Sequence, residues 1–97
     1  MAKQVAKYET TVIFNTKNGD EAVEALKERF HNLISENGEI TKEEEWGKRK
    51  LAYPIEDETE GYYYFVEFSS APSFPAELDR IYKITDGVLR SLIIVQD

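Results

Sequence analysis

The sequence predicts an α+β domain in which two helices cover one face of a four-stranded antiparallel sheet. Segments with apolar residues at every second position are interspersed with segments in which apolar residues recur every three or four positions. Their order along the chain is β-α-β-β-α-β. Two split βαβ units of this size form the ferredoxin-like arrangement. A length of 97 residues suits one domain, residues 1–97, with a single core.

The first two elements are predicted over residues 7–15 and 20–37. Residues 7–15 alternate and are rich in β-branched and aromatic side chains, which favours a strand with one buried face. The next segment is amphipathic and predicts a helix capped by Asn18 or Asp20 and ended by a left-handed cap at Asn37 and Gly38. Its expected buried stripe comprises Ala22, Val23, Leu26, Phe30, Leu33 and Ile34. Its expected outer residues include Glu24, Lys27, Glu28 and Glu36.

The second half of the chain is predicted to add a hairpin, a helix and a closing strand. A long strand over residues 40–55 is expected to bulge at Gly47, and the polar turn 56–61 connects it to a strand over 62–70. Ser73 is expected to cap a helix whose apolar stripe comprises Phe74, Leu78, Ile81 and Tyr82. The last segment, "DGVLRSLIIVQ", is apolar on nearly both sides, so this strand is predicted to be covered on both faces.

Composition indicates an ordinary globular protein and excludes several kinds of site. Hydrophobic residues make up 41% of the chain and charged residues 32%. The absence of cysteine excludes disulfides and thiolate zinc sites. No signal-peptide pattern opens the chain, and the apolar run 92–95 is too short to span a bilayer, so we expect an intracellular, soluble protein.

Signals for catalysis are weak, and we expect no enzyme, no metal and no cofactor. His31 is the only histidine and therefore lacks a second histidine with which to bind a metal. The serines have no evident base beside them. The five glycines are isolated, which excludes a glycine-rich phosphate loop.

Charge is unevenly distributed around the single tryptophan. The net charge of -7 disfavours nonspecific nucleic-acid binding, yet Lys48, Arg49 and Lys50 follow Trp46 as a cationic island between the acidic runs 43–45 and 56–60. Cations of this kind can protect an edge strand from aggregation. They can equally bind phosphates while the tryptophan packs on a sugar, a base or a partner chain. Strand alternation puts Trp46, Lys48 and Lys50 on one side and Arg49, Leu51, Tyr53 and Ile55 on the other, unless a bulge resets the phase.

An RNA-recognition motif has the same element order, and residues 61–68 lie where its third-strand signature would be expected. The segment "EGYYYFVEF" ends in the F-V-x-F pattern of that motif. However, Gly61 stands in the place of its cation, Tyr62 in the place of its glycine and Tyr64 in the place of its small residue. Tyrosines of a buried strand explain this segment more simply than a base-stacking platform.

Three segments resemble the bacterial small-subunit ribosomal proteins of the S-six family. They are "YETTVIF" near the start, "EWGKRKLAYPI" in the middle and "ITDGVLRSLII" near the end, in the family's order and spacing. The resemblance implies a ferredoxin-like fold, no catalytic activity and a cytoplasmic, ribosome-associated protein. It also implies binding to the central domain of small-subunit ribosomal RNA as a heterodimer with ribosomal protein S-eighteen.

The resemblance, together with the cationic island, selects the candidate site residues. The expected RNA contacts are Lys7, Trp46, Lys48, Arg49, Lys50, Lys83 and Arg90. The expected partner contacts are Trp46, Leu51 and Tyr53. Two alternatives stay open for Arg90, an RNA contact or an ion pair with Asp86 or Glu67. A ligand-sensing or oligomerising regulatory module is the rival function, because many such domains share this topology.

Overall fold

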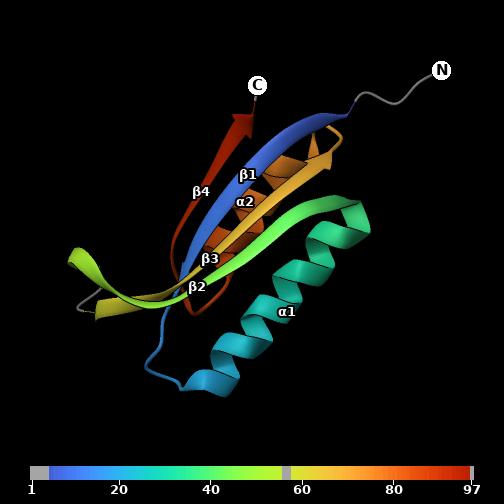
Figure 1. Ribbon diagram of the computed structural model, residues 1–97. Helices are drawn as coiled ribbons and strands as arrows, with labels where there is room; N and C mark the ends of the chain where they lie inside the picture. The colour runs from blue at the N-terminus through green and yellow to red at the C-terminus, as the bar shows by residue number, and fades with distance from the viewer. Residues whose placement is uncertain (1–4, 56–57, 97) are drawn as a thin grey trace.

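The computed structural model describes residues 5–55 and 58–96 and confirms the predicted order of elements (Figure 1). The bounds are β1 (Ala6–Phe14), α1 (Asp20–Asn37), β2 (Gly38–Ile55), β3 (Glu58–Ser70), α2 (Phe74–Ile84) and β4 (Val88–Gln96). Of the predicted turn 56–61, Glu56 and Asp57 lie outside the described residues, and β3 already begins at Glu58. None of the helices within the described ranges is both long enough and apolar enough to cross a membrane.

The four strands form one antiparallel sheet in the order β2-β3-β1-β4, so that β2 and β4 are its edges. Both helices pack on one face of this sheet, and no helix or strand of the described residues covers the opposite face, which we call the open face (Figure 1). The hairpin of β2 and β3 projects beyond the helices (Figure 1). This arm contributes to an elongated molecule with extents of 48 × 24 × 23 Å.

The core lies between the sheet and the two helices and is rich in aromatic rings. On β1 the alternation predicted from the sequence is confirmed, because Tyr8, Thr10, Val12 and Phe14 are all buried. The hydroxyl groups of Thr10 and Tyr82 are 3.1 Å apart, which satisfies two buried polar groups at the centre of the core. The remaining core side chains are Val23, Phe30, Ile34, Tyr64, Val66, Phe68, Phe74 and Leu78.

The predicted helix caps differ from the observed ones. Gly38 is extended, with φ of -171°, so the expected left-handed cap at the end of α1 is wrong and the chain passes directly into β2. A Cβ at Gly38 would meet the Ser69 carbonyl oxygen at 2.2 Å, so a glycine here permits close approach to β3. At its start, α1 is preceded by Gly19 with φ of 91°, and neither Asn18 nor Asp20 caps it through a side chain. Ser73 precedes α2 as predicted, without a side-chain hydrogen bond to the helix.

Two burial predictions were wrong for reasons of topology. β4 is an edge strand, and its Leu92, Ile94 and Val95 are 55%, 44% and 62% exposed, so the last strand is not covered on both faces in this chain alone. Lys27 was placed on the outside of α1, but it is only 8% exposed because it lies over β2 and β3.

Candidate nucleic-acid and partner interface

The register of the strands defines which side chains share the open face. Tyr63 of β3 pairs with Ile13 of β1, which pairs with Arg90 of β4. One step along the sheet, Phe65 pairs with Thr11 and Thr11 with Leu92. Two further rows follow on this face. The first contains Ile94 of β4, Glu9 of β1, Glu67 of β3 and Lys42 of β2. The second contains Gln96 of β4, Lys7 of β1 and Ser69 of β3. One end of the open face is therefore aromatic and cationic, and the middle carries carboxylates.

A bulge in β2 places Trp46 on this face. Glu45 pairs with Tyr64 and Gly47 with Tyr63, so Trp46 is the extra residue between two paired positions. Gly47 has φ of 77°, a conformation that favours glycine, which confirms the predicted bulge. The Trp46 ring stacks on Phe65 with centroids 5.3 Å apart and lies 6.4 Å from the Tyr63 ring. The tryptophan remains 38% exposed.

The bulge also changes how the three cations of the island are presented. Arg49 lies over the Trp46 ring, 5.7 Å from its centroid, and its Nε donates to the Trp46 carbonyl at 3.3 Å. Lys48 instead forms an ion pair with Asp20 of α1 at 3.2 Å. Trp46 therefore shares its side with Arg49 and not with Lys48, so the phase expected for an uninterrupted strand is wrong. Lys50 is exposed and forms no ion pair with any residue that the structure describes.

Arg90 and Tyr53 contact each other beside the cluster formed by Trp46 and Arg49. Arg90 donates a hydrogen bond to the Tyr53 hydroxyl at 2.6 Å, although the two residues are 37 positions apart. Among the described residues Arg90 forms no ion pair, so neither Asp86 nor Glu67 is its partner. Tyr53 is 59% exposed, whereas Leu51 is only 7% exposed and offers a partner little surface.

Two of the expected RNA contacts lie away from the cluster. Lys83 is on α2, behind the sheet, and pairs with Asp79 at 2.9 Å. Lys7 lies on the open face at the opposite end of β1, paired in register with Gln96 and Ser69. The structure thus brings together Trp46, Arg49, Tyr53 and Arg90, with Lys50 close by in the chain, and leaves Lys7 and Lys83 peripheral.

Carboxylates border the aromatic end of the face. Glu44 accepts a hydrogen bond from the Trp46 indole Nε1 at 3.0 Å, and this bond, together with nearby Lys42, lowers the pKa of the Glu44 carboxyl. Glu9 and Glu67 stand opposite one another in the β1–β3 ladder. The Gln96 amide donates to both of them, and Lys42 lies 3.9 Å from Glu67.

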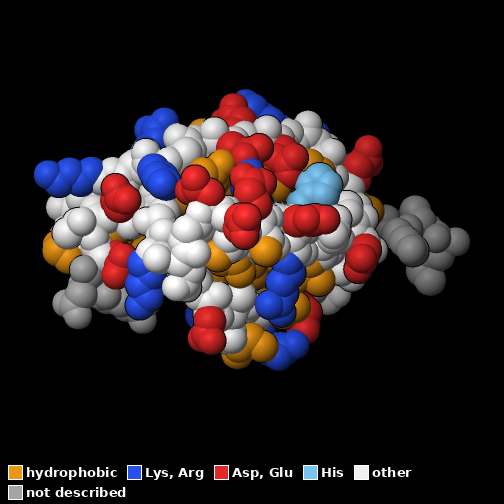
Figure 2. Space-filling model, turned by 90° about the horizontal axis from the view of Figure 1, so that it is seen from below, with side chains coloured by type: hydrophobic (Ala, Val, Ile, Leu, Met, Phe, Trp, Pro, Cys, Tyr) orange, Lys and Arg blue, Asp and Glu red, His pale blue; other side chains and the backbone are white. Residues whose placement is uncertain are grey.

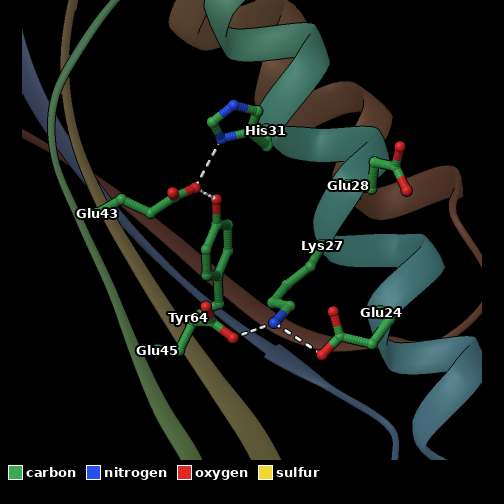
Figure 3. Close-up of a pocket in the computed structure, with 7 residues that line it drawn as sticks. All are labelled: Glu24, Lys27, Glu28, His31, Glu43, Glu45 and Tyr64. Atoms are coloured by element: carbon green, nitrogen blue, oxygen red, sulfur yellow. Dashed lines mark hydrogen bonds and ion pairs between the residues drawn. The ribbon is translucent and has the colours of Figure 1, made fainter.

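An ionic cluster lies between α1 and β2, on the face of the hairpin opposite the open face (Figure 3). The sequence did not predict it. Lys27 forms ion pairs with Glu24 and Glu45, and it lies 3.4 Å from the Tyr62 hydroxyl. Burial alone would lower the pKa of Lys27, but these hydrogen bonds outweigh it and raise that pKa. The bonds from Lys27 and then Tyr62 lower the pKa of Glu45.

A second group of the same cluster is centred on Glu43. It accepts hydrogen bonds from the Tyr64 hydroxyl and from His31 Nδ1, the latter at 2.7 Å. Burial opposes ionisation of Glu43, yet the two bonds prevail and lower its pKa. Burial, followed by the bond to Glu43, raises the pKa of Tyr64. No group of three or more potential metal ligands with suitable geometry occurs in the described part of the chain.

Acidic and basic side chains are unevenly distributed over the surface. Acidic side chains crowd around the pale blue histidine, whereas lysines and arginines lie at the hairpin end at the left and in the lower middle of this view (Figure 2). The cationic island thus stands at the tip of a mostly anionic molecule.

Comparisons with known proteins agree with the fold and the motifs. The family model described as Ribosomal protein S6 matches residues 7–95. The chain is 54% identical over 91 residues to the small ribosomal subunit protein bS6 of Caldanaerobacter subterraneus subsp. tengcongensis, with 93% of this chain and 96% of that protein covered. It is 55% identical, with the same coverage, to the bS6 protein of Thermoanaerobacter pseudethanolicus.

A solved structure is similar over nearly the whole chain. The crystal structure of the 30S ribosomal protein S6 of Thermotoga maritima aligns with a TM-score of 0.89 at 30% identity, covering 96% of this chain and 89% of that one. The resemblance seen in the sequence is therefore confirmed. The chain belongs to the ribosomal protein S6 family and is a noncatalytic, ribosome-associated constituent of the small ribosomal subunit in the cytoplasm.

Proposed function

We propose that the chain binds the central domain of small-subunit ribosomal RNA together with ribosomal protein S-eighteen, through the β2–β3 hairpin and the adjoining end of the open face. The observation that carries this proposal is the position of Arg49. The bulge at Gly47 places its guanidinium over the exposed Trp46 ring, in the hairpin that also carries Lys48 and Lys50.

The RNA contacts would come from the hairpin tip. Arg49 and Arg90 each present a planar guanidinium fork, which suits phosphate oxygens, and neither is engaged in an ion pair within the described residues. Lys50 adds an exposed ammonium group. Lys48 would contribute after exchanging Asp20 for a phosphate, a modest cost because exposed ion pairs are weak. Lys7 and Lys83 would contact RNA only at the periphery.

The protein partner would dock on the apolar strip of the open face. This strip joins the stacked Trp46 and Phe65 to Leu92 and Ile94, and the latter two are 55% and 44% exposed. Carboxylates flank the strip at Glu9, Glu44 and Glu67, which favours a basic partner. Tyr53 would complete the contact near Arg90, while the buried Leu51 would support the arm from within.

A partner is expected because this chain alone neutralises few phosphates. Three to five phosphate contacts give a slope of roughly -3 to -4 in a plot of log K against log salt concentration. The rest of the surface is anionic, with a net charge of -7. We therefore expect modest RNA affinity for the chain alone and a large gain when ribosomal protein S-eighteen is added.

The test replaces Lys48, Arg49 and Lys50 together by glutamine. Binding of the variant to a central-domain RNA fragment in the presence of ribosomal protein S-eighteen should weaken, and its salt slope should fall by roughly 2 to 3. The matched control replaces Lys17, Arg29 and Arg80, three cations outside β2 and β3 that are not among the expected RNA contacts. It should change the salt slope by less than the equivalent of one phosphate contact.

Circular dichroism must show that both triple variants remain folded. Unchanged affinity and slope in the hairpin variant would overturn the proposed RNA contact and leave protection of the β2 edge as the role of these cations. An affinity that does not increase when ribosomal protein S-eighteen is added to the wild-type chain would overturn the heterodimer.

A further inference from the structure

Lys27 is a buried cation whose contacts converge on the strand that carries the RNA-binding hairpin. It is 8% exposed, which is unusual for a lysine. Its ammonium group pairs with Glu45 and with Glu24, 2.8 Å away, and lies 5.3 Å from the centre of the Tyr62 ring. Tyr62 in turn donates to Glu45 at 2.8 Å. Lys27, Glu45 and Tyr62 thus form a closed triangle among α1, β2 and β3, of which Figure 3 shows the bond between Lys27 and Glu45.

The position of Glu45 in the strand gives this triangle its significance. Glu45 immediately precedes the bulge formed by Trp46 and Gly47. Its side chain points toward α1, whereas Trp46 points to the opposite face and stacks on Phe65. Because neighbouring side chains of a strand alternate between faces, fixing the side of Glu45 also fixes the side of Trp46.

The bulge makes such an anchor necessary. An extra residue disrupts the ladder locally, and a shift of one residue would turn every following side chain to the other face. In that alternative phase Trp46 and Arg49 would face α1 and the acidic cluster. A contact on the helix side, next to the bulge, distinguishes the two arrangements. Lys27 makes it at Glu45, the residue that immediately precedes the bulge, whereas His31 reaches Glu43 two residues earlier.

We infer that Lys27 is a positioning residue for the proposed RNA and partner interface, because its bond to Glu45 holds the bulge in the phase that places Trp46 and Arg49 on the open face. This inference rests on the proposed function for its consequence, but not for its geometry. Lys27 itself would touch neither RNA nor the partner protein.

The first experiment needs neither RNA nor a partner. Trp46 is the only tryptophan, so its fluorescence reports its position directly. In Lys27→Met we expect the emission to shift to longer wavelength and acrylamide quenching to increase, because the ring leaves its stack on Phe65. Lys27→Arg, which keeps the charge, should restore much of the wild-type spectrum. Glu45→Gln keeps the shape of the strand residue and should resemble Lys27→Met, which covers the case that the methionine variant fails to fold.

Two control variants separate positioning from stability. Val23→Ala also alters the buried side of α1, but it touches the apolar core and leaves Glu45 untouched. It should lower the unfolding temperature without changing the Trp46 spectrum of the folded protein. Glu24→Gln removes the other acidic partner of Lys27, which is on α1 itself, and should leave the spectrum unchanged.

Binding is then measured at a temperature at which every variant is folded. Lys27→Met should weaken RNA binding with ribosomal protein S-eighteen by roughly tenfold, comparable to one charged hydrogen bond, whereas Val23→Ala should not. A wild-type Trp46 spectrum in folded Lys27→Met, or equal losses in the methionine and alanine variants, would overturn the inference. If the wild-type chain fails to bind RNA, the proposed function falls, and the fluorescence of Trp46 still decides whether Lys27 positions it.

Discussion

Gly47 and Gly61 both lie in the β2–β3 hairpin, and each stands where a side chain is unfavourable for a different reason. Gly47 has φ of 77°, but a Cβ there would meet no atom within 4 Å. Gly61 does not have a positive φ, yet a Cβ there would lie 2.3 Å from Cγ2 of Ile13. Ile13 is buried and β-branched, so it has little freedom to move. Gly47 is thus required by the backbone and Gly61 by packing.

Replacing each glycine by alanine should distinguish these causes. Gly47→Ala should lower the free energy of unfolding by about 1 kcal/mol, the cost of a left-handed conformation for one residue. Gly61→Ala should cost about 1 to 3 kcal/mol through overpacking against Ile13. Denaturant unfolding of both variants measures the difference, and Gly61→Ala proving the milder of the two would contradict the packing argument.

For single residues, the sequence predicted the bulge at Gly47 but not which cation the bulge would place on the same face as Trp46. An isolated glycine inside a strand pattern predicted the irregularity at Gly47. Which cation then shares a face with Trp46 depends on the number of residues inserted, which alternation alone does not specify. The burial of Lys27 was missed because a lysine on a helix is ordinarily solvated, and its acidic partner Glu45 comes 18 positions later.

At the level of whole elements, a carboxylate of β2 forms an ion pair with α1, and the stability that this contact contributes depends on pH. The hydrogen bonds from Lys27 and Tyr62 lower the pKa of Glu45 below its value in the unfolded chain, about 4.5. A carboxyl group with a depressed pKa contributes stability that is fully present above the unfolded value and is lost as the pH falls through the folded value. The contact between α1 and β2 should therefore weaken in acid.

Glu45→Gln tests this dependence. The variant should be less stable than the wild-type chain at pH 7, and the difference between the two should shrink as the pH is lowered from about 5 toward 3. Thermal unfolding followed by circular dichroism at several pH values measures it. Glu36→Gln, an exposed position with no ion pair among the described residues, is the control. A difference between Glu45→Gln and the wild type that stays constant down to pH 3 would contradict the ionic role of Glu45.

For whole elements, the sequence predicted most bounds because their signals are local. Alternation and helical periodicity placed every strand and helix within a few residues, and the predicted helix over residues 20–37 agrees with α1. Local signals of this kind could not predict whether both faces of β4 are covered by other parts of the chain. Its apolar residues on both faces indicated burial, but an edge strand can carry them for a partner that the chain alone does not contain.

For the molecule as a whole, the unequal distribution of charge is expected to select one RNA site. The hairpin tip carries exposed cations, and acidic residues cover much of α1 and β2 (Figure 2). A phosphate backbone is attracted at the tip and repelled elsewhere, so the chain should not coat unrelated RNA. Glu28, Glu36 and Glu39 belong to this repelling surface, and none of them forms an ion pair among the described residues.

Replacing Glu28, Glu36 and Glu39 together by glutamine changes the net charge from -7 to -4 without altering the cationic hairpin. We expect binding to an unrelated RNA of equal length to become measurable at low salt, because fewer anionic groups oppose the phosphates. Binding to the central-domain fragment with ribosomal protein S-eighteen should change much less, since it depends on the tip. Filter binding over a salt series measures both. An equal gain for both RNAs would mean that the acidic surface merely sets overall affinity and contributes nothing to selectivity.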